Sequence, residues 1–107
     1  MTRDDVTAAA HGDPDAFSRL VDTHRQAVCA ITLGILGDPT AGEDAAQEAF
    51  LTAWRELPRL RAPAGFTAWL HQIARNQARM HARASRRARV VVDGGVVARS
   101  VSGEPSP

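Results

Sequence analysis

The chain has 107 residues, which suits one domain near the lower size limit for a stable core, and 44% of these residues are hydrophobic. Its single cysteine, Cys29, excludes an internal disulfide framework. The net charge of +1 hides a strong asymmetry: residues 1–57 carry four arginines against ten acids, whereas residues 58–92 carry eight arginines and no acid. Such a division predicts two different partners.

Apolar residues recur at helical spacing from the N-terminus onward, and no segment clearly predicts a strand. A short helix is expected over residues 3–10. Asp13 followed by Pro14 predicts the start of a long helix, because aspartate caps a helix and proline suits its first turn. Gly37 is expected to end this helix. Its apolar face is predicted to contain Phe17, Leu20, Val21, His24, Val28, Ile31 and Ile35.

A second long helix is predicted to follow at once, since Asp38 and Pro39 repeat the same start signal. Pro58 cannot continue a helix and is expected to stop this one. The buried face should comprise Ala46, Ala49, Phe50, Ala53, Trp54 and Leu57. Residues 58–65, PRLRAPAG, are expected to form a loop. The arginines of this loop are Arg59 and Arg61.

A third long helix is predicted from Phe66 to about Arg87. Its inner face should contain Phe66, Trp69, Leu70, Ile73, Gln77 and Met80. Residues 90–107 include a Gly-Gly pair and a Ser/Pro-rich end, so we expect a linker or flexible tail there. The predicted fold is all-α: a compact bundle of three long helices plus a short N-terminal helix in residues 1–89, followed by the tail.

The third long helix is strongly basic. Its arginines recur at steps of three or four and are expected to form one stripe, about 18 Å long at a rise of 1.5 Å per residue. The members are Arg75, Arg79, Arg83 and either Arg86 or Arg87. A solvated helix face usually mixes acids with its arginines, and this segment has none, so nucleic acid is the favoured partner. A membrane surface or an acidic protein is the alternative.

The second long helix carries acids on its outer face. That face is predicted to contain Asp44, Gln47, Glu48, Leu51 and Arg55. On composition alone it is a solvated acidic surface, although Leu51 is an apolar residue in polar surroundings. A helix-turn-helix that inserts this helix into the major groove is excluded, because its carboxylates would face the phosphates.

The sequence shows no pattern typical of catalysis or cofactor binding. The histidines, at His11, His24, His71 and His81, have no metal-binding spacing with one another or with Cys29. Cys29 is expected to be a small packed side chain, and His24 to lie at the edge of the core. We therefore expect a protein that is not an enzyme and holds no metal or cofactor. It also lacks an apolar run of membrane-spanning length and a signal pattern, so a cytoplasmic protein without membrane contact is expected.

Two stretches, GEDAAQEAFLTAW at residues 42–54 and FTAWLHQIARN at residues 66–76, resemble region two of extracytoplasmic-function (ECF) sigma factors. These are promoter-specificity subunits of bacterial RNA polymerase. The resemblance covers residues 13–89 and includes the Leu-Gly-Asp turn and the trailing arginines. It rests on several motifs that occur in the family's order and spacing, because any one of them alone is a weak signal.

The resemblance implies a protein partner for the acidic helix. In this family the outer face of the second long helix docks on the coiled-coil clamp helices of the β′ subunit of core RNA polymerase. The polymerase-binding residues expected here are Asp44, Gln47, Glu48, Leu51 and Arg55.

The resemblance also implies that the third long helix and the loop before it bind promoter DNA, on the nontemplate single strand of the minus-ten element. One base of that strand is flipped into a pocket formed by the loop. Asn76 is expected to contact base edges, because an amide both donates and accepts. Phe66 either stacks in that pocket or packs on Trp69 and Ile73. The expected DNA-binding residues are Arg59, Arg61, Phe66, Arg75, Asn76, Arg79, Arg83, Arg86 and Arg87.

The expected function is promoter recognition and opening by a sigma domain bound to core polymerase. The alternative is a sigma-like interaction module that binds polymerase or a regulator without opening promoters. An anti-sigma factor is a common partner in the family, but no residue here identifies one. The family's second helical domain, which reads the minus-thirty-five element, does not follow within these 107 residues. The chain is therefore expected to be either a fragment or a protein with region two alone.

Overall fold

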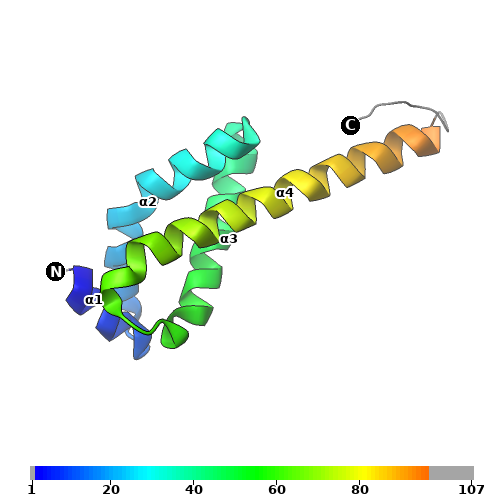
Figure 1. Ribbon diagram of the computed structural model, residues 1–107. Coiled ribbons are helices and arrows are strands. Elements are labelled where there is room, and N and C mark those ends of the chain that lie inside the picture. The colour runs from blue at the N-terminus through cyan, green and yellow to red at the C-terminus, as the bar shows by residue number, and fades with distance from the viewer. Residues whose placement is uncertain (1, 97–107) are drawn as a thin grey trace.

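Four α-helices and two short 3₁₀ turns make up the described part of the chain (Figure 1). The computed structural model describes the backbone of residues 2–96 and the side chains of residues 3–88. The elements are α1 (Thr2–Ala10), α2 (Pro14–Leu36), α3 (Pro39–Glu56), η1 (Leu57–Arg59), η2 (Pro63–Gly65) and α4 (Phe66–Val96). The predicted all-α fold, with one short and three long helices, is confirmed.

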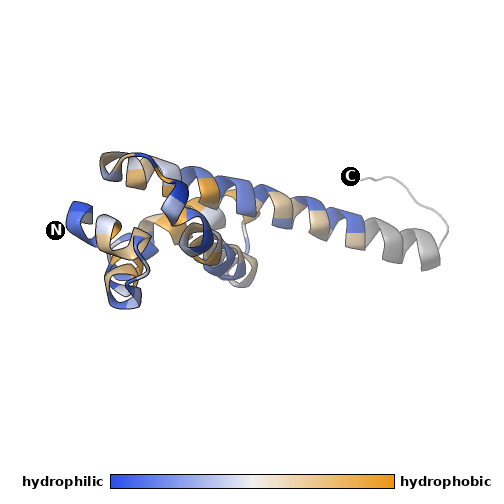
Figure 2. Ribbon diagram, turned by 90° about the horizontal axis from the view of Figure 1, so that it is seen from below, coloured by the Kyte–Doolittle hydropathy of each residue, from blue (hydrophilic) through white to orange (hydrophobic). Residues whose placement is uncertain are grey.

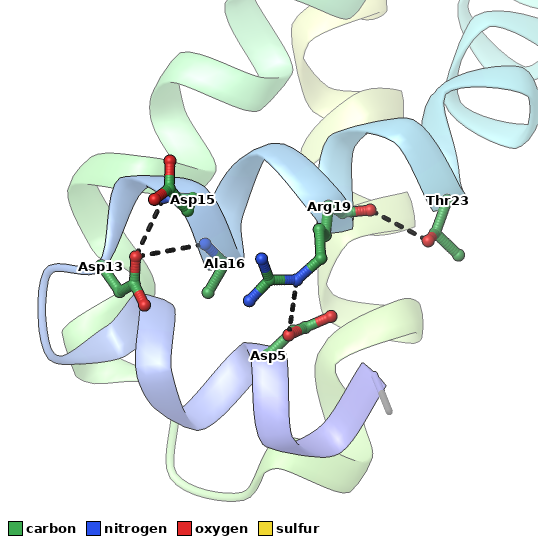
Figure 3. A network of polar contacts seen from close by, with 6 residues as sticks. All are labelled: Asp5, Asp13, Asp15, Ala16, Arg19 and Thr23. Carbon is green, nitrogen blue, oxygen red and sulfur yellow. Dashed lines mark hydrogen bonds and ion pairs between the residues drawn. The ribbon is translucent and has the colours of Figure 1, made fainter.

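The start of α2 is fixed by polar contacts around its first turn (Figure 3). The Asp13 carboxylate accepts hydrogen bonds from the backbone N–H groups of Asp15, at 2.9 Å, and Ala16, at 3.3 Å. These bonds satisfy donors that have no partner within the helix. One helical turn further on, Arg19 Nε lies 3.1 Å from Asp5 Oδ1, so an exposed ion pair joins α2 to α1.

The boundary between α2 and α3 follows the predicted signals. Gly37 has a φ of 70°, in the left-handed region that favours glycine, and its N–H donates to the Leu33 carbonyl at 2.7 Å. Directly after it, the Asp38 carboxylate accepts from the Ala41 N–H at 2.8 Å. The chain therefore reverses within two residues, and this places α3 against α2.

The core lies where α2, α3 and α4 pack against one another, with α1 packed against α2. Its largest fully buried side chains include Leu20, Leu57, Phe66 and Leu70. Small side chains let the helix backbones approach closely, and the buried alanines of α3 and α4 are Ala45, Ala46, Ala49, Ala53, Ala74 and Ala78. Figure 2 shows hydrophobic residues gathered toward the middle of the bundle.

Two residues that the sequence places on buried faces are exposed. Ile35, in the last turn of α2, has an exposed fraction of 39%, because α2 ends there without a helix packed over it. Met80 has an exposed fraction of 50%. It follows Ala78, the last buried residue among the described side chains of α4, so it lies where this helix leaves the bundle.

α4 continues well beyond the expected end near Arg87, to Val96. Its C-terminal part projects from the bundle (Figure 1), and the structure is elongated at 55 × 22 × 20 Å. The radius of gyration is 17.2 Å, against about 13 Å for a compact domain of 100 residues. Residues 90–96, expected in the tail, are helical, and residues 97–107 lie outside the described residues. No helix within residues 2–96 combines the length and hydropathy required to cross a bilayer.

Candidate functional site

The outer face of α3 presents the residues that the sequence predicts there, and all of them are exposed. On a helix with 3.6 residues per turn they lie within about 100° of one another, on the side opposite the buried alanines. Leu51 has an exposed fraction of 52%, although it is apolar. We call this set the acidic face of α3: Asp44, Gln47, Glu48, Leu51 and Arg55.

The predicted arginine stripe of α4 divides into two groups. Each four-residue step advances about 40° around the helix, so Arg83 and Arg87 lie about 80° and 120° from Arg75. Arg79 and Arg86 stay within about 40° of Arg75, since their offsets are four and eleven residues. We call Arg75, Arg79 and Arg86 the ridge arginines, and Arg83 and Arg87 the wall arginines. The ridge arginines are exposed, except Arg75, which is half-buried.

The wall arginines face the acidic face of α3 across an open depression of about 630 Å³. The residues that line it are Asp44, Gln47, Glu48, Leu51, Gln77, Met80, His81, Arg83, Ala84 and Arg87. One wall is therefore acidic, the other basic, and Leu51 and Met80 add apolar surface. Gln77 Nε2 donates to Thr52 Oγ1 at 3.2 Å, which links the two helices beside the depression. The ridge arginines do not line it.

A second, more apolar groove of about 440 Å³ lies between α2 and α3. Its lining includes Phe17, Val21, Phe50 and Trp54, which the sequence placed in the core and which are half-buried. The rings of Phe17 and Trp54 pack at a centroid distance of 5.0 Å. Gln47 and Leu51 line both this groove and the depression, so the acidic face of α3 separates the two hollows.

Asn76 is exposed on α4 and is held by a chain of side-chain hydrogen bonds. Gln72 Nε2 donates to Asn76 Oδ1 at 3.1 Å, and Arg75 Nη2 donates to Gln72 Oε1 at 3.3 Å. The side-chain oxygen of Asn76 thereby already accepts one hydrogen bond. The NH₂ group of the same side chain supplies two further hydrogen-bond donors. Sequence analysis missed Gln72, although its place four residues before Asn76 on a helix is the signal that predicts the contact.

Phe66 lies in the core, with an exposed fraction of 1%. Its ring meets His24 edge-on at a centroid distance of 5.2 Å and lies 5.9 Å from Trp69. His24 is also buried: its Nδ1 donates to the Leu20 carbonyl at 2.9 Å, and its Nε2 shares a hydrogen bond with the Thr67 hydroxyl at 3.3 Å. The packing role for Phe66 is favoured, because base stacking would require the ring to leave these contacts.

The loop between α3 and α4 is tied to the bundle by its first residue. Leu57 is fully buried, Leu60 packs against the core, and both 3₁₀ turns contact α1. Arg59 and Arg61 are exposed on this loop. The start of α4 is about 20 Å from Arg79 at a rise of 1.5 Å per residue, so the loop before α4 is well separated from this ridge arginine.

Within the described residues, no group of three or more His, Cys, Asp or Glu side chains is arranged to hold a metal ion. His71 Nε2 is buried without a hydrogen-bond partner, and Cys29 is half-buried in the packing of α2. Neither side chain belongs to a cluster of such groups.

Residues 20–88 match the model of a family described as Sigma-70 region 2. Over 107 residues the chain is 40% identical to the probable RNA polymerase sigma factor RfaY of Xanthomonas campestris pv. campestris, covering all of this chain and 27% of that protein. Over 76 residues, 71% of this chain, it is 34% identical to the RNA polymerase sigma-H factor of Pseudomonas aeruginosa, covering 39% of it. The ECF RNA polymerase sigma factor SigW of Bacillus subtilis is 32% identical over 76 residues, 41% of its length.

The chain is thus similar in sequence to RNA polymerase sigma factors. The chain belongs to the sigma-70 region 2 family. The family inferred from the motifs at residues 42–54 and 66–76 is confirmed, and both motifs lie inside the matched range. The matches span between 27% and 41% of the length of these three relatives.

Proposed function

We propose that the chain acts as region two of a sigma factor: it docks on core RNA polymerase through the acidic face of α3 and binds the opened minus-ten element through α4 and the loop before it. The observation that carries this proposal is the placement of two exposed surfaces of opposite charge on two different helices of a sigma region-two fold. Each surface then serves one partner, and the bundle holds them in a fixed relation.

The protein partner is the pair of clamp helices of the polymerase β′ subunit. Leu51 is an exposed leucine on the same helix face as Asp44 and Glu48, about two helical turns after Asp44 and one turn after Glu48. A partner helix that covers the leucine with apolar side chains and meets the carboxylates with basic ones matches this pattern. Because the groove between α2 and α3 begins at the same residues, an anti-sigma factor that covers Leu51 would compete with polymerase.

The nucleic-acid partner is the nontemplate single strand. The ridge arginines supply charge for phosphates, and Asn76 supplies an amide held in place by Gln72. Flipping a base from the duplex costs a few kcal/mol, which these contacts and those of the loop must offset. No covalent chemistry is needed for this role, and it is performed in the cytoplasm, where the polymerase and the chromosome are.

The docking half of the proposal is tested by Glu48→Arg and Leu51→Asp. Each should weaken binding to core polymerase at least tenfold, about 1.4 kcal/mol, because each removes a central contact of the acidic face. Both positions are exposed, so melting temperatures should move by less than about 4 °C. Binding is measured by fluorescence anisotropy of the labelled chain titrated with core polymerase.

Glu56→Arg is the matched control. It makes the same charge reversal on the same helix at an exposed position outside the acidic face, and we expect polymerase affinity to stay within about twofold of the parent value. Equal affinities for the parent, Glu48→Arg and Leu51→Asp would disprove docking through this face. Polymerase binding without any shift of minus-ten single strands by the complex would instead favour an interaction module that does not open promoters.

A further inference from the structure

The depression between α3 and α4 contains charges that the chain does not pair internally. Asp44 and Glu48 on one wall and Arg83 and Arg87 on the other all line the same hollow. Arg19 and Asp5 form the sole ion pair among the described side chains, so no carboxylate of α3 lies within 4.0 Å of an arginine of α4. The two charged walls therefore flank one open depression without a direct ion pair between them.

The wall arginines are poorly placed for nucleic acid. A phosphate seated between Arg83 and Arg87 would also approach Asp44 and Glu48 across the depression, and like charges at short range repel. The ridge arginines do not line the depression and no acid precedes Asp93 on their helix, so they lack this opposition. The charges around them therefore separate the wall arginines from the ridge arginines, which the sequence alone predicts to form a single DNA-binding stripe on α4.

A helical protein segment fits the depression. Its two walls are helices, and Leu51 on the acidic wall and Met80 on the basic wall add apolar surface to it. A helix with an apolar stripe, basic residues on one flank and acidic residues on the other would complement the apolar surface, the acidic wall and the basic wall of the depression. Both apolar side chains are about half exposed, so such a helix would remove substantial hydrophobic surface from water.

We propose that the polymerase-docking surface extends from α3 onto α4, and that Met80, Arg83 and Arg87 form its second wall. The occupant is the same clamp-helix segment of the polymerase that the acidic face of α3 is proposed to bind, and it must present acidic side chains toward α4. The inference rests on the proposed function and deepens it. It moves Arg83 and Arg87 from the DNA-binding set to the polymerase-binding set.

Two double variants with equal charge provide the test. Arg83→Gln with Arg87→Gln neutralises the wall, and Arg79→Gln with Arg86→Gln neutralises two positions of the ridge. Both lower the net charge by two on the same exposed helix, so differences between them report position alone. Each 107-residue chain is checked by circular dichroism, then titrated with core polymerase without DNA, and the complexes are titrated with a labelled single-stranded oligonucleotide.

We expect the wall variant to lose about three- to tenfold in polymerase affinity, with a loss that shrinks as salt rises, and to retain DNA affinity in the saturated complex within about twofold. The ridge variant should show the reverse. A wall variant that binds polymerase like the parent and loses DNA affinity as the ridge variant does would overturn the inference. If Glu48→Arg and Leu51→Asp still weaken polymerase binding in that case, the proposed function stands and only the second wall is wrong.

Discussion

Gly42 is the residue at which α3 approaches α2 without room for a side chain. A Cβ atom there would lie 3.2 Å from both the Cα and the backbone N of Leu33. The contact is reinforced by Thr32, whose buried hydroxyl donates to the Gly42 carbonyl at 2.7 Å. This pair of contacts fixes the crossing of the two helices and so the orientation of the acidic face, which begins two residues later.

Gly42→Ala should therefore destabilise the fold by about 1–2 kcal/mol, because overpacking outweighs the gain of up to about 1 kcal/mol in helix propensity. Gly34→Ala is the control: it lies in α2 with open space around its Cβ direction, and it should stabilise by about 0.5–1 kcal/mol. The free energy of unfolding in urea measures both. Two changes of the same sign would show that helix propensity, not the contact with Leu33, decides the outcome.

The burial of His24 could not be predicted from the local sequence. The sequence places it on the apolar side of α2, and its expected position was the edge of the core. The structure buries it to 7% exposure, where its two ring nitrogens hold Leu20 and Thr67. The partner in α4 is 43 residues away along the chain, so no local pattern predicts it. Phe66, which the sequence left between two roles, also packs against a residue distant in the chain, since its ring makes a T-shaped contact with His24.

At the scale of the helices, the boundaries of α2 and α3 were predicted well from the sequence, because their signals are local. Asp13 and Asp38 cap α2 and α3 through their own side chains, and Gly37 adopts a left-handed conformation, so each boundary depends on a few neighbouring residues. The outer face of α3 was likewise predictable, because helical geometry alone separates it from the buried alanines.

The two features of α4 that the sequence did not predict depend on its surroundings. The Gly-Gly pair at residues 94–95, expected in a linker, lies within the helix, because glycine weakens a helix without removing a hydrogen bond as proline does. Met80 has the spacing of a buried residue, yet it is half exposed beside the open depression between α3 and α4. Where a helix leaves its neighbours depends on their lengths, which the periodicity of α4 does not contain.

On α4, residues that recognise the DNA sequence should be separable by mutation from residues that only position the strand through its phosphates. Asn76→Ala should reduce discrimination among minus-ten sequences and leave the salt dependence unchanged, because it removes an amide and no charge. Gln72→Ala should act in the same direction, since it releases the Asn76 carbonyl. The measurement is selection by the polymerase complex from a single-stranded pool randomised across the minus-ten segment, followed by binding of selected strands across a salt series.

Arg79→Ala is the contrasting variant. It should weaken binding about equally for all selected strands and lower the slope of log affinity against log salt by roughly 0.7, the share of one phosphate contact on single-stranded DNA. If Asn76→Ala instead lowers all affinities equally and flattens that slope, Asn76 is a backbone contact, and sequence must be read by the loop at residues 58–65.

Across the whole molecule, the charge asymmetry sets how the two partners depend on each other. The net charge is only +1, so the chain has little long-range attraction for DNA despite its ridge arginines. The acids of α3 lie on the same small bundle and oppose any polyanion that approaches without orientation. Once polymerase covers the acidic face, that opposition is removed and the arginine ridge is held at a defined position.

The chain alone should therefore bind single-stranded DNA weakly, with a Kd of about 10–100 µM at physiological salt, the range of non-specific contacts. Saturating core polymerase should tighten binding to a selected minus-ten strand at least tenfold, because docking orients the ridge and screens the acids. In Leu51→Asp this enhancement should be lost at polymerase concentrations that saturate the parent, while the weak affinity of the variant chain alone stays close to the parent value. Anisotropy of a labelled strand, with and without polymerase, measures all four affinities. Equal tightening in the parent and in Leu51→Asp would mean that DNA binding does not depend on docking through α3, and the two surfaces would then act independently.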